Sequence, residues 1–380
     1  MINDVYPKIW DWYPEKTNPF SSLWWFYLLL PRHEDGSYGP KQIMFVLVSA
    51  AGERVKVNGT EYDGLPLRNV DGTRPAHREQ PIPGYALGWM YNGQRMYDKL
   101  IDETVVARLA KGQSIYAWNE RGYGGEIVRS DGDGNPPLAM DARFCGVQGG
   151  GEFRVWGDPT AEISSPHASA IDTPLGGADT LAWRHIHFEG AFTSPSGTET
   201  LSGIGYFQRI CLNILPFPWK WIWAAFGDGS IFSCFIPYVG PHMARRGDLL
   251  YPHWLENLTV SIMPSGYFSR ARNSATTLET THFKTVRVGV QPQNGSYPQF
   301  VVYCQAENDD FLSFRLHPYA HNQVVLERPK LKRRWWSLYN YNEYLFRTEA
   351  LTGRIGGKPL DTEAMSPGYG NLEYTWGLGL

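Results

Sequence analysis

The sequence has few cysteines and no paired cysteine motif. Its 380 residues include four cysteines, none of them in a CxxC arrangement: Cys145, Cys211, Cys234 and Cys304. Zinc ribbons, redox dithiols and disulfide scaffolds all need closely spaced or paired cysteines, so the spacing argues against each of them. We expect four buried free thiols.

Long hydrophobic runs are also missing. The longest apolar stretches, LWWFYLLL (23–30) and IMFVLVSAA (43–51), fall well short of the roughly 18–20 residues that span a bilayer. The N-terminus has no basic region followed by an apolar stretch, so no secretory signal is expected and the mature protein is expected to start here. These features predict a soluble, cytoplasmic protein.

The chain has no large excess of charge of either sign. The net charge is −3 and the pI is about 6.4, so nucleic acid is not an expected partner. One basic run, in ERPKLKRRWW (327–336), contains Lys330, Lys332, Arg333 and Arg334. With its flanking tryptophans it either rests weakly on an anionic membrane surface or forms a solvated edge that blocks strand pairing.

Several common functional motifs are absent as well. The chain contains no GxxxxGK[ST], HExxH or GxSxG sequence, and GYGGE (122–126) lacks the strand and helix of a dinucleotide loop. SDGDGN (130–135) begins like a calcium loop, but Pro136 and Ala142 stand where glycine and glutamate are required, which indicates a turn. Nucleotide-dependent and serine-hydrolase chemistry are therefore not expected.

Aromatic residues, glycine and proline are plentiful. The chain has 15 Trp, 22 Tyr, 18 Phe, 40 Gly and 27 Pro, a mixture that favours strands and turns. Turn-forming clusters recur between apolar runs of strand length at 33–39, 58–64, 129–137, 194–198, 291–298 and 351–359. This spacing is typical of all-β sandwiches and barrels. Helices are expected only at 103–112 and 247–258.

Two internal similarities divide the chain. Each of two tryptophan-rich strands is followed by an Asp-Gly-Ser turn and an apolar strand, with Asp35-Gly36-Ser37 matching Asp228-Gly229-Ser230. In addition, GIGYFQ (203–208) aligns with GYGNLE (368–373). Such internal similarities indicate a repeat. The sequence predicts two similar units, an N-terminal lipocalin-like domain at 1–213 and a C-terminal one at 214–380, joined at the proline-rich 215–219.

This arrangement resembles the double-lipocalin superfamily, which includes carotenoid 1,2-hydratases, AttH-like proteins, tocopherol cyclases and decalin-forming Diels-Alderases. The resemblance rests on the WWF strand near the start, on GIGYFQ and PWKWIWAAFGDGS in the centre, and on GYGNLEYT near the end. It implies tandem antiparallel β-barrels and an apolar isoprenoid or polyene substrate. Hydratase-like members typically carry an Asp-His pair where this chain reads Tyr206-Phe207-Gln208-Arg209, so the resemblance implies no single reaction.

The aromatic strand 217–223 supplies the main candidates for substrate binding. Alternate residues of a strand share one face, so Trp219, Trp221 and Trp223 are expected to line the interior of a barrel. Their rings would hold an apolar substrate and stabilise a developing carbocation by about 0.5–2 kcal/mol each. The alternative is that they simply fill the core or the seam between the two predicted units. Trp24, Trp183 and Asn371 complete the expected substrate contacts.

A second strand, 180–190, offers acid–base candidates. Simple alternation places Trp183, His185, His187 and Glu189 on one face, so His187 beside Glu189 would form an oriented proton donor whose pKa the carboxylate raises. The alternative is that this polar face meets solvent while Ile186 and Phe188 point inward. A metal site is not expected, because Glu189 lies too far along the strand from His185 to complete one.

Glu373 is the remaining carboxylate of interest, since its counterpart in the first unit is the neutral Gln208. Burial among aromatic rings would raise its pKa and keep it protonated, as a general acid toward an alkene requires. The alternative is that Glu373 is a hydrogen-bonded residue of the closing strand that helps to lock the barrel. Tyr206, on the face of Gln208, either donates a hydrogen bond or packs.

Together these features predict a cofactor-independent enzyme that promotes hydration or cyclisation of a hydrophobic small molecule. Two other functions stay open. A non-catalytic lipid or pigment carrier would have the same cavity without a buried ionisable group. A carbohydrate-active β-sandwich would set its rings in an open cleft beside two carboxylates roughly 5–10 Å apart.

Overall fold

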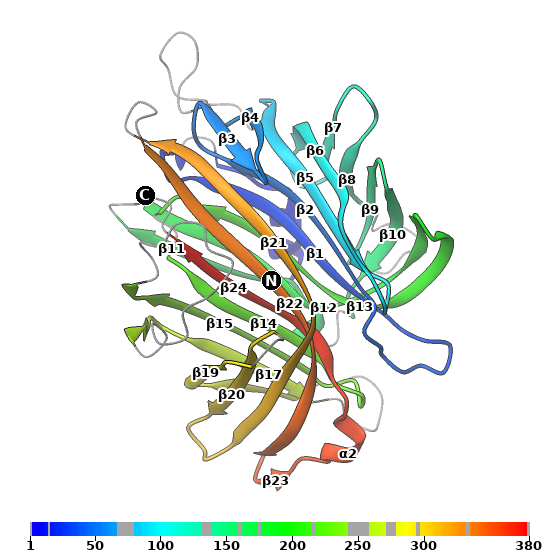
Figure 1. The fold of residues 1–380 in the computed structure, drawn as a ribbon, viewed down its shortest axis with the longest axis vertical. Coiled ribbons are helices and arrows are strands. Elements are labelled where there is room, and N and C mark those ends of the chain that lie inside the picture. The colour runs from blue at the N-terminus through cyan, green and yellow to red at the C-terminus, as the bar shows by residue number, and fades with distance from the viewer. Residues whose placement is uncertain are drawn as a thin grey trace. The chain divides into compact units, whose positions relative to one another are not determined.

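The computed structural model of the protein describes residues 2–13, 16–66, 80–130, 138–158, 162–173, 176–214, 217–241, 258–270, 279–293, 297–330 and 335–377. It is almost entirely built of antiparallel strands (Figure 1), which confirms the predicted all-β fold class. Contacts divide the chain into two compact units. The first comprises 1–32, 41–216 and 327–336, and the second comprises 33–40, 217–326 and 337–380.

The first unit contains a closed ten-stranded barrel. Its strands follow the order β10-β9-β8-β7-β6-β5-β2-β1-β13-β12, and pairing of β10 with β12 closes the sheet. The strands of this unit are β1 (Ser22–Pro31), β2 (Gln42–Ala50), β3 (Arg54–Val57), β4 (Thr60–Asp63), β5 (Ile82–Tyr91), β6 (Met96–Ala110), β7 (Ser114–Trp118), β8 (Gly124–Arg129), β9 (Ala139–Gly146), β10 (Gly149–Trp156), β11 (His167–Thr173), β12 (Gly176–Ser194) and β13 (Gly197–Leu212). A short helix, η3 (Glu162–Ser164), precedes β11.

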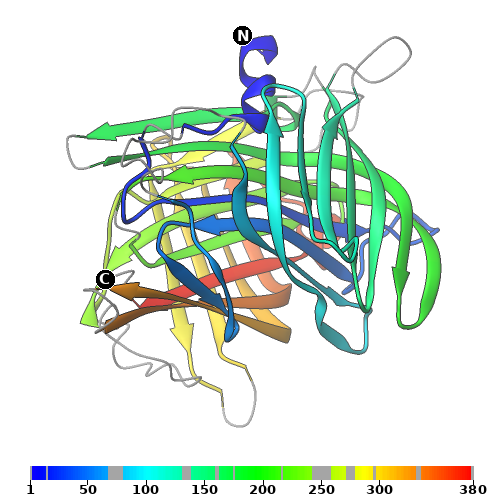
Figure 2. The same cartoon turned by 90° about the horizontal axis from the view of Figure 1, so that it is seen from above.

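The N-terminal segment contributes to the core of this barrel. It forms helices α1 (Ile2–Val5) and η1 (Tyr6–Trp10), drawn in dark blue in Figure 2, and its Tyr6, Ile9 and Trp10 are buried with the inward side chains of the strands. The Trp10 indole donates a hydrogen bond to the carbonyl of Ile127 at 2.9 Å. The interior of the first barrel is therefore packed with the chain's own side chains.

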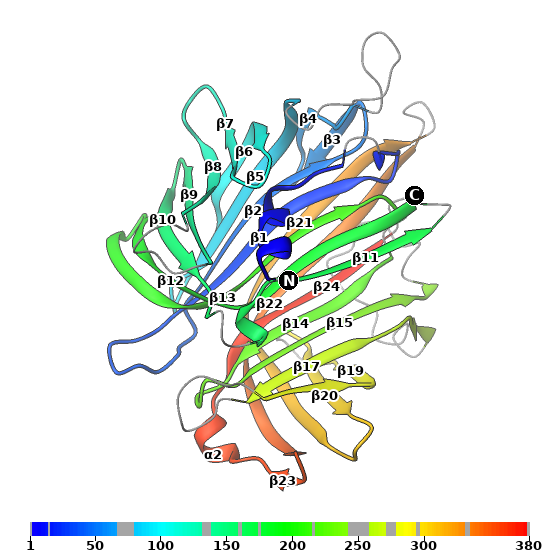
Figure 3. The same ribbon diagram turned by 180° about the vertical axis from the view of Figure 1, so that it is seen from behind.

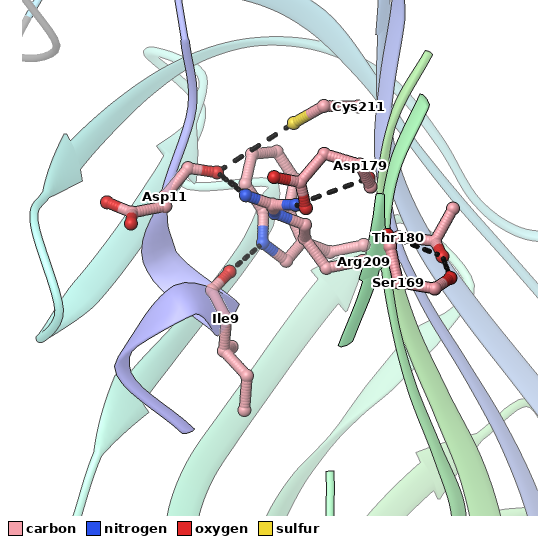
Figure 4. A network of polar contacts seen from close by, with 8 residues as sticks. Ile9, Asp11, Ser169, Asp179, Thr180, Arg209 and Cys211 are labelled. Carbon is pink, nitrogen blue, oxygen red and sulfur yellow. Dashed lines mark hydrogen bonds and ion pairs between the residues drawn. The ribbon is translucent and has the colours of Figure 1, made fainter. Parts of the chain in front are cut away.

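A buried arginine holds the end of this segment. The guanidinium of Arg209, on β13, donates to the carbonyl of Asp11 from Nε at 3.0 Å and from Nη2 at 2.7 Å, and it pairs with Asp179 at 2.5 Å (Figure 4). Arg209 is fully buried, and a buried charge is tolerated only when it is paired and hydrogen-bonded. The network therefore anchors the N-terminal segment to β12 and β13.

One segment that was expected to be a helix belongs to strand β6. The segment 103–112 was predicted to be helical, but residues up to Ala110 belong to this strand. Val105, Ala107 and Leu109 are buried, whereas Thr104, Val106 and Arg108 are exposed. That period of two fits a strand with one face on the core. The other predicted helix, 247–258, lies almost wholly outside the described residues.

The second unit is a further antiparallel sheet. Its main path runs β18-β17-β15-β14-β24-β22-β21-β20-β19. Figure 3 shows β24, β14 and β15 of this path side by side. The elements are β14 (Trp219–Ala225), β15 (Ile231–Val239), β16 (Val260–Ser261), β17 (Ser265–Arg270), β18 (Glu279–Phe283), β19 (Thr285–Gln291), β20 (Gln299–Gln305), β21 (Phe311–Lys330), β22 (Trp335–Ile355), β23 (Lys358–Pro359), α2 (Thr362–Met365) and β24 (Tyr369–Gly377). Its own core includes Ile222, Phe232, Phe314, Phe346 and Leu372.

The predicted repeat is visible in two turns of the same geometry. Ser37 donates its backbone N–H to Asp35 Oδ1 at 2.9 Å, and Ser230 donates to Asp228 Oδ1 at the same distance. Gly36 and Gly229 both adopt a φ of 84°, a left-handed conformation that favours glycine. In each repeat the closing strand pairs with the opening one, β13 with β1 and β24 with β14.

The predicted boundary at 213/214 lies close to the change of unit between 216 and 217. The units also include segments from the other side of that boundary, since 327–336 groups with the first unit and 33–40 with the second. Independent folding of 1–213 and 214–380 stays a prediction. Among the described residues no helix has the length and apolar character needed to cross a bilayer.

Candidate functional site

Both faces of β14 are buried, and the tryptophans occupy the face opposite to the core of the second unit. Ile222 and Ala224 belong to that core, whereas Trp219, Trp221 and Trp223 project from the other side of the strand. The expectation that these rings line a barrel interior was therefore wrong. Alternation shows which residues share a face, but it cannot identify the core face of a strand that is buried on both sides.

The tryptophan face carries two carboxyl groups on adjacent strands. Glu373 on β24 is the direct register partner of Trp221 on β14 and of Glu343 on β22. Directly opposed residues of an antiparallel pair have Cβ atoms about 4.5–5.5 Å apart. The side chains of Glu343 and Glu373 are only 4% and 5% exposed. The sheet thus brings two buried carboxyl groups together, and we call them the carboxyl pair.

Each member of the carboxyl pair accepts one hydrogen bond from a neighbour on the same face. The Trp219 indole N–H donates to Glu373 Oε2 at 2.7 Å. The Asn371 amide donates through Nδ2 to Glu343 Oε2. Asn371 is fully buried, and its Oδ1 accepts no hydrogen bond from any described residue. These bonds fix the orientation of both carboxyl groups.

The environment favours protonation of the pair. Burial raises the pKa of Glu373 to about 7, against the lowering effect of the Trp219 hydrogen bond. Burial and the neighbouring Glu373 charge raise the pKa of Glu343 well above its ordinary value. The expected rise in the pKa of Glu373 is therefore present. Because the two groups repel each other when both are ionised, the pair as a whole favours holding a proton near neutral pH.

Aromatic rings surround one end of the pair. The Trp219 ring lies 5.6 Å from that of Tyr339 and 5.5 Å from that of Tyr341, and the two tyrosine rings are 4.9 Å apart. Tyr339 also hydrogen-bonds to Thr375 Oγ1 at 3.1 Å. Such ring faces carry partial negative charge, so the cluster suits an apolar or positively charged group.

Glu343 was not identified from the sequence. Its signal was present, because YNYNEYLF (339–346) places Glu343 in phase with Tyr339 and Tyr341 on a strand just before the closing one. A lone charge on an aromatic face is unusual enough to suggest a buried carboxyl. The cross-strand register that sets it opposite Glu373, however, is a tertiary property.

Lys220 was also missed, although it stands between the tryptophans. It projects toward the core of the second unit, where Nζ donates to the carbonyl of Val288 at 3.0 Å and lies 5.1 Å from the ring centre of Tyr374. Burial lowers the pKa of Lys220 to about 7. It is on the opposite face of the sheet from the carboxyl pair.

Three predicted site residues lie on the outer face of the first barrel. Trp25, rather than Trp24, enters the barrel core, and Trp24 is half-buried on the other face of β1. On β13, the Tyr206 hydroxyl donates to Gln208 Oε1 at 3.0 Å. Tyr206 and Gln208 therefore share a face, as the sequence predicted, and that face points away from the barrel core.

A β-bulge changes the interpretation of the strand 180–190. The register of β12 against β13 shifts between Trp183 and Ile186, so Trp183 enters the core together with Ile186. Trp183 is thus not on the face of His185 and His187, whose rings contact each other at 4.7 Å. Alternation across an unrecognised bulge inverts every later assignment.

His187 does not have the raised pKa that was expected. Burial and the nearby charge of Arg32 lower the pKa of its imidazole, and Glu189 is exposed. The His187 ring packs on Trp156 at 5.8 Å. A neutral imidazole that stacks on a tryptophan is better suited to packing than to donating a proton.

Two further expectations concern charged clusters. Lys332, Arg333 and Arg334 lie outside the described residues, as does the side chain of Lys330, so contact of this run with a membrane stays a prediction. Within the described ranges, no three His, Cys, Asp or Glu side chains are grouped so that they could hold a metal ion.

No protein-family model matches the chain, and no curated protein matches its sequence. Among solved structures it is similar to a putative AttH protein of Nitrosomonas europaea, with a TM-score of 0.48 and 11% identity over 96% of this chain and 95% of that chain. Kievitone hydratase of Nectria haematococca gives 0.42 and 12% over 96% and 91%, and CghA gives 0.47 and 10% over 95% and 90%. Each of these is a similarity of fold at low sequence identity.

Proposed function

We propose that this protein is an enzyme that binds an apolar isoprenoid or polyene molecule at the carboxyl pair and promotes its hydration or cyclisation by acid–base chemistry. The observation that supports this most directly is the pairing of Glu343 with Glu373 on one buried, aromatic face. A packed hydrophobic face has no structural need for two carboxyl groups, because their burial costs free energy.

The pair can act as acid and base in one turnover. In hydration, Glu343 transfers its proton to an alkene carbon, the π electrons form the new C–H bond, and a water oxygen adds to the resulting cation. Glu373 takes the proton that the added water loses. In cyclisation, a second double bond adds to the cation instead, and Glu373 removes a proton from carbon. General acid–base catalysis of this kind contributes about 10²–10⁴-fold.

The aromatic rings support the same chemistry. Trp219 orients Glu373 through its indole N–H and presents its ring among those of Tyr339 and Tyr341. Each well-placed ring would stabilise the cationic transition state by about 0.5–2 kcal/mol. The mechanism that we propose needs no cofactor.

The carbohydrate-active alternative receives less support. Sugar-binding tryptophans present their faces in an open cleft, whereas Trp219, Trp221 and Trp223 are 6%, 4% and 0% exposed. A carrier is still an alternative, and it differs from an enzyme in its dependence on the carboxyl pair.

The proposed function can be tested by incubating the purified protein with a panel of polyenes and prenylated aromatic compounds in D₂O, followed by mass spectrometry. We expect a product that has gained one molecule of water, or an isomer of the substrate. Glu373→Gln and Glu343→Gln should each lower turnover by at least about 100-fold, while quenching of tryptophan fluorescence by the substrate persists.

Glu349→Gln is the matched control, because Glu349 lies on the same strand but its side chain is 38% exposed and paired with Arg347. It should leave turnover unchanged. Saturable binding without any product across the panel would favour a carrier, and full turnover in Glu373→Gln would refute the proposed mechanism.

A further inference from the structure

The carboxyl pair and its neighbours form a region rich in hydrogen-bond acceptors. Glu343 and Glu373 contribute four carboxyl oxygens. Among the residues that the structure describes, only the two Oε2 atoms accept hydrogen bonds, from Asn371 and Trp219. The fully buried Oδ1 of Asn371 adds another acceptor that no described residue satisfies. Buried acceptors are usually satisfied, and each exception requires an explanation.

No cation of the protein compensates these groups within the described ranges. Neither Glu343 nor Glu373 forms an ion pair there, and no basic side chain contributes to the electrostatic environment of either. Lys220, the nearest lysine in sequence to Trp219 and Trp221, points to the opposite face of the sheet. With one shared proton the pair carries a net charge of −1, which one bound cation would neutralise.

The rings on this face favour the same kind of ligand. Trp219, Tyr339 and Tyr341 lie within 5.6 Å of one another by their ring centres. Aromatic faces attract ammonium groups, most strongly where water is excluded. The acceptors add directionality, because an N–H donor can satisfy Asn371 Oδ1, which a quaternary ammonium group cannot.

We propose that the carboxyl pair, together with Asn371 Oδ1 and the Trp219–Tyr339–Tyr341 rings, is a binding site for apolar molecules that carry a protonated amine. This inference goes beyond the proposed function, because it concerns the charge of a bound ligand and requires no reaction. It names two classes of ligand, substrates with a basic nitrogen and amine inhibitors that mimic a carbocation.

Isothermal titration calorimetry at pH 7 with four probes that share a ten-carbon chain, each below its micelle concentration, tests the inference. The probes are N,N-dimethyldecylamine, decyltrimethylammonium, 1-decanol and decanoate. We expect the tertiary amine to bind at least about 10-fold more tightly than decanol, because charge-assisted hydrogen bonds are the stronger ones. The quaternary ammonium should rank between them, and decanoate last.

Variants test whether the preference for the amine depends on the carboxyl pair and on Asn371. The double variant Glu343→Gln/Glu373→Gln should bind amine and decanol equally, and Asn371→Ala should reduce the difference between the tertiary and quaternary probes. Glu349→Gln should keep the wild-type ranking. Equal binding of amine and decanol by the wild-type protein would overturn the inference without any variant, and so would a preference that survives in the double variant.

The two proposals fail separately. Loss of turnover in Glu373→Gln without any amine preference would leave the proposed function intact and remove this inference. A preference for the amine without any product from the polyene panel would support this inference and count against the proposed function.

Discussion

At the scale of single residues, the face of the strand decides what each ionisable group does. Lys220 and Trp221 are neighbours in the sequence, yet Lys220 points into the core of the second unit and Trp221 stands beside Glu373. Burial lowers the pKa of Lys220 to about 7 and raises that of Glu373 to about 7. In both cases the low-polarity surroundings disfavour the charged form.

The raised pKa of Glu373 predicts a pH-dependent stability. The folded protein binds this proton more tightly than the unfolded chain, in which the pKa is about 4.5. The resulting stabilisation is complete below about pH 4.5 and is lost as the pH rises through about 7. We therefore expect Glu373→Gln to be more stable than the wild type at pH 8 by on the order of 1–3 kcal/mol, and to lose less stability between pH 5 and pH 8.

Urea unfolding at both pH values measures this difference in the free energy of unfolding. Glu349→Gln serves as the comparison, because its side chain lies partly in solvent, and it should follow the wild-type pH profile. Parallel profiles for the wild type and Glu373→Gln would contradict a raised pKa.

At the scale of elements, strand geometry explains both the correct and the incorrect assignments. The β12 bulge between Trp183 and Ile186 reverses the expected face of Trp183. On β24, by contrast, the uninterrupted alternation of Asn371, Glu373 and Thr375 keeps all three on the face opposite to Leu372. The register with β14 and β22 then positions the carboxyl pair.

Gly370 maintains that register and provides a test of it. A Cβ atom there would overlap the carbonyl oxygen of Trp223 and lie 2.8 Å from Ala224 Cα. We expect Gly370→Ala to destabilise the protein by about 1–3 kcal/mol and to reduce turnover, because β24 must move away from β14. Gly289→Ala is the control, since a Cβ at Gly289 on β19 meets nothing within 4 Å. Thermal unfolding of both variants measures the difference, and equal melting temperatures would refute the close approach.

At the scale of the whole molecule, the two units are not simple halves of the chain. Arg328 lies near the end of β21, a strand that begins in the second unit, but it groups with the first unit, where it is 3% exposed. Its guanidinium donates to the Ser22 hydroxyl and to the Ser21 carbonyl, the latter at 3.3 Å. The first unit thus depends on residues 327–336, which lie far from its other segments in the sequence.

This dependence predicts the behaviour of a fragment. Residues 1–213 expressed alone lack 327–336 and leave the backbone around Ser22 without its arginine donor, so we expect the fragment to be markedly less stable than the full chain or to aggregate. Size-exclusion chromatography and urea unfolding measure this. A monomeric fragment that unfolds at the same urea concentration as the full chain would show instead that 1–213 is an independent domain.

Much of the fold follows from local physical chemistry. The Asp-Gly-Ser turns at 35–37 and 228–230 are visible in the sequence because a carboxylate cap and a left-handed glycine form the same turn in any context. The burial of Glu373 could likewise be expected from its place in an aromatic closing strand. The helix predicted at 103–112 was wrong because the short pattern ETVVARLAKG fits either period, and only pairing with β5 and β7 selects the strand.

The sequence by itself determined an all-β chain with an internal repeat, because turns and alternation depend on neighbours along the chain. Tertiary structure alone decided that the tryptophans face away from the core of the second unit and that Glu343 lies opposite Glu373. Both faces of these strands are buried, so hydrophobicity does not distinguish them. The cross-strand register that joins residues 343 and 373 arises from hydrogen bonds between segments that are distant in sequence.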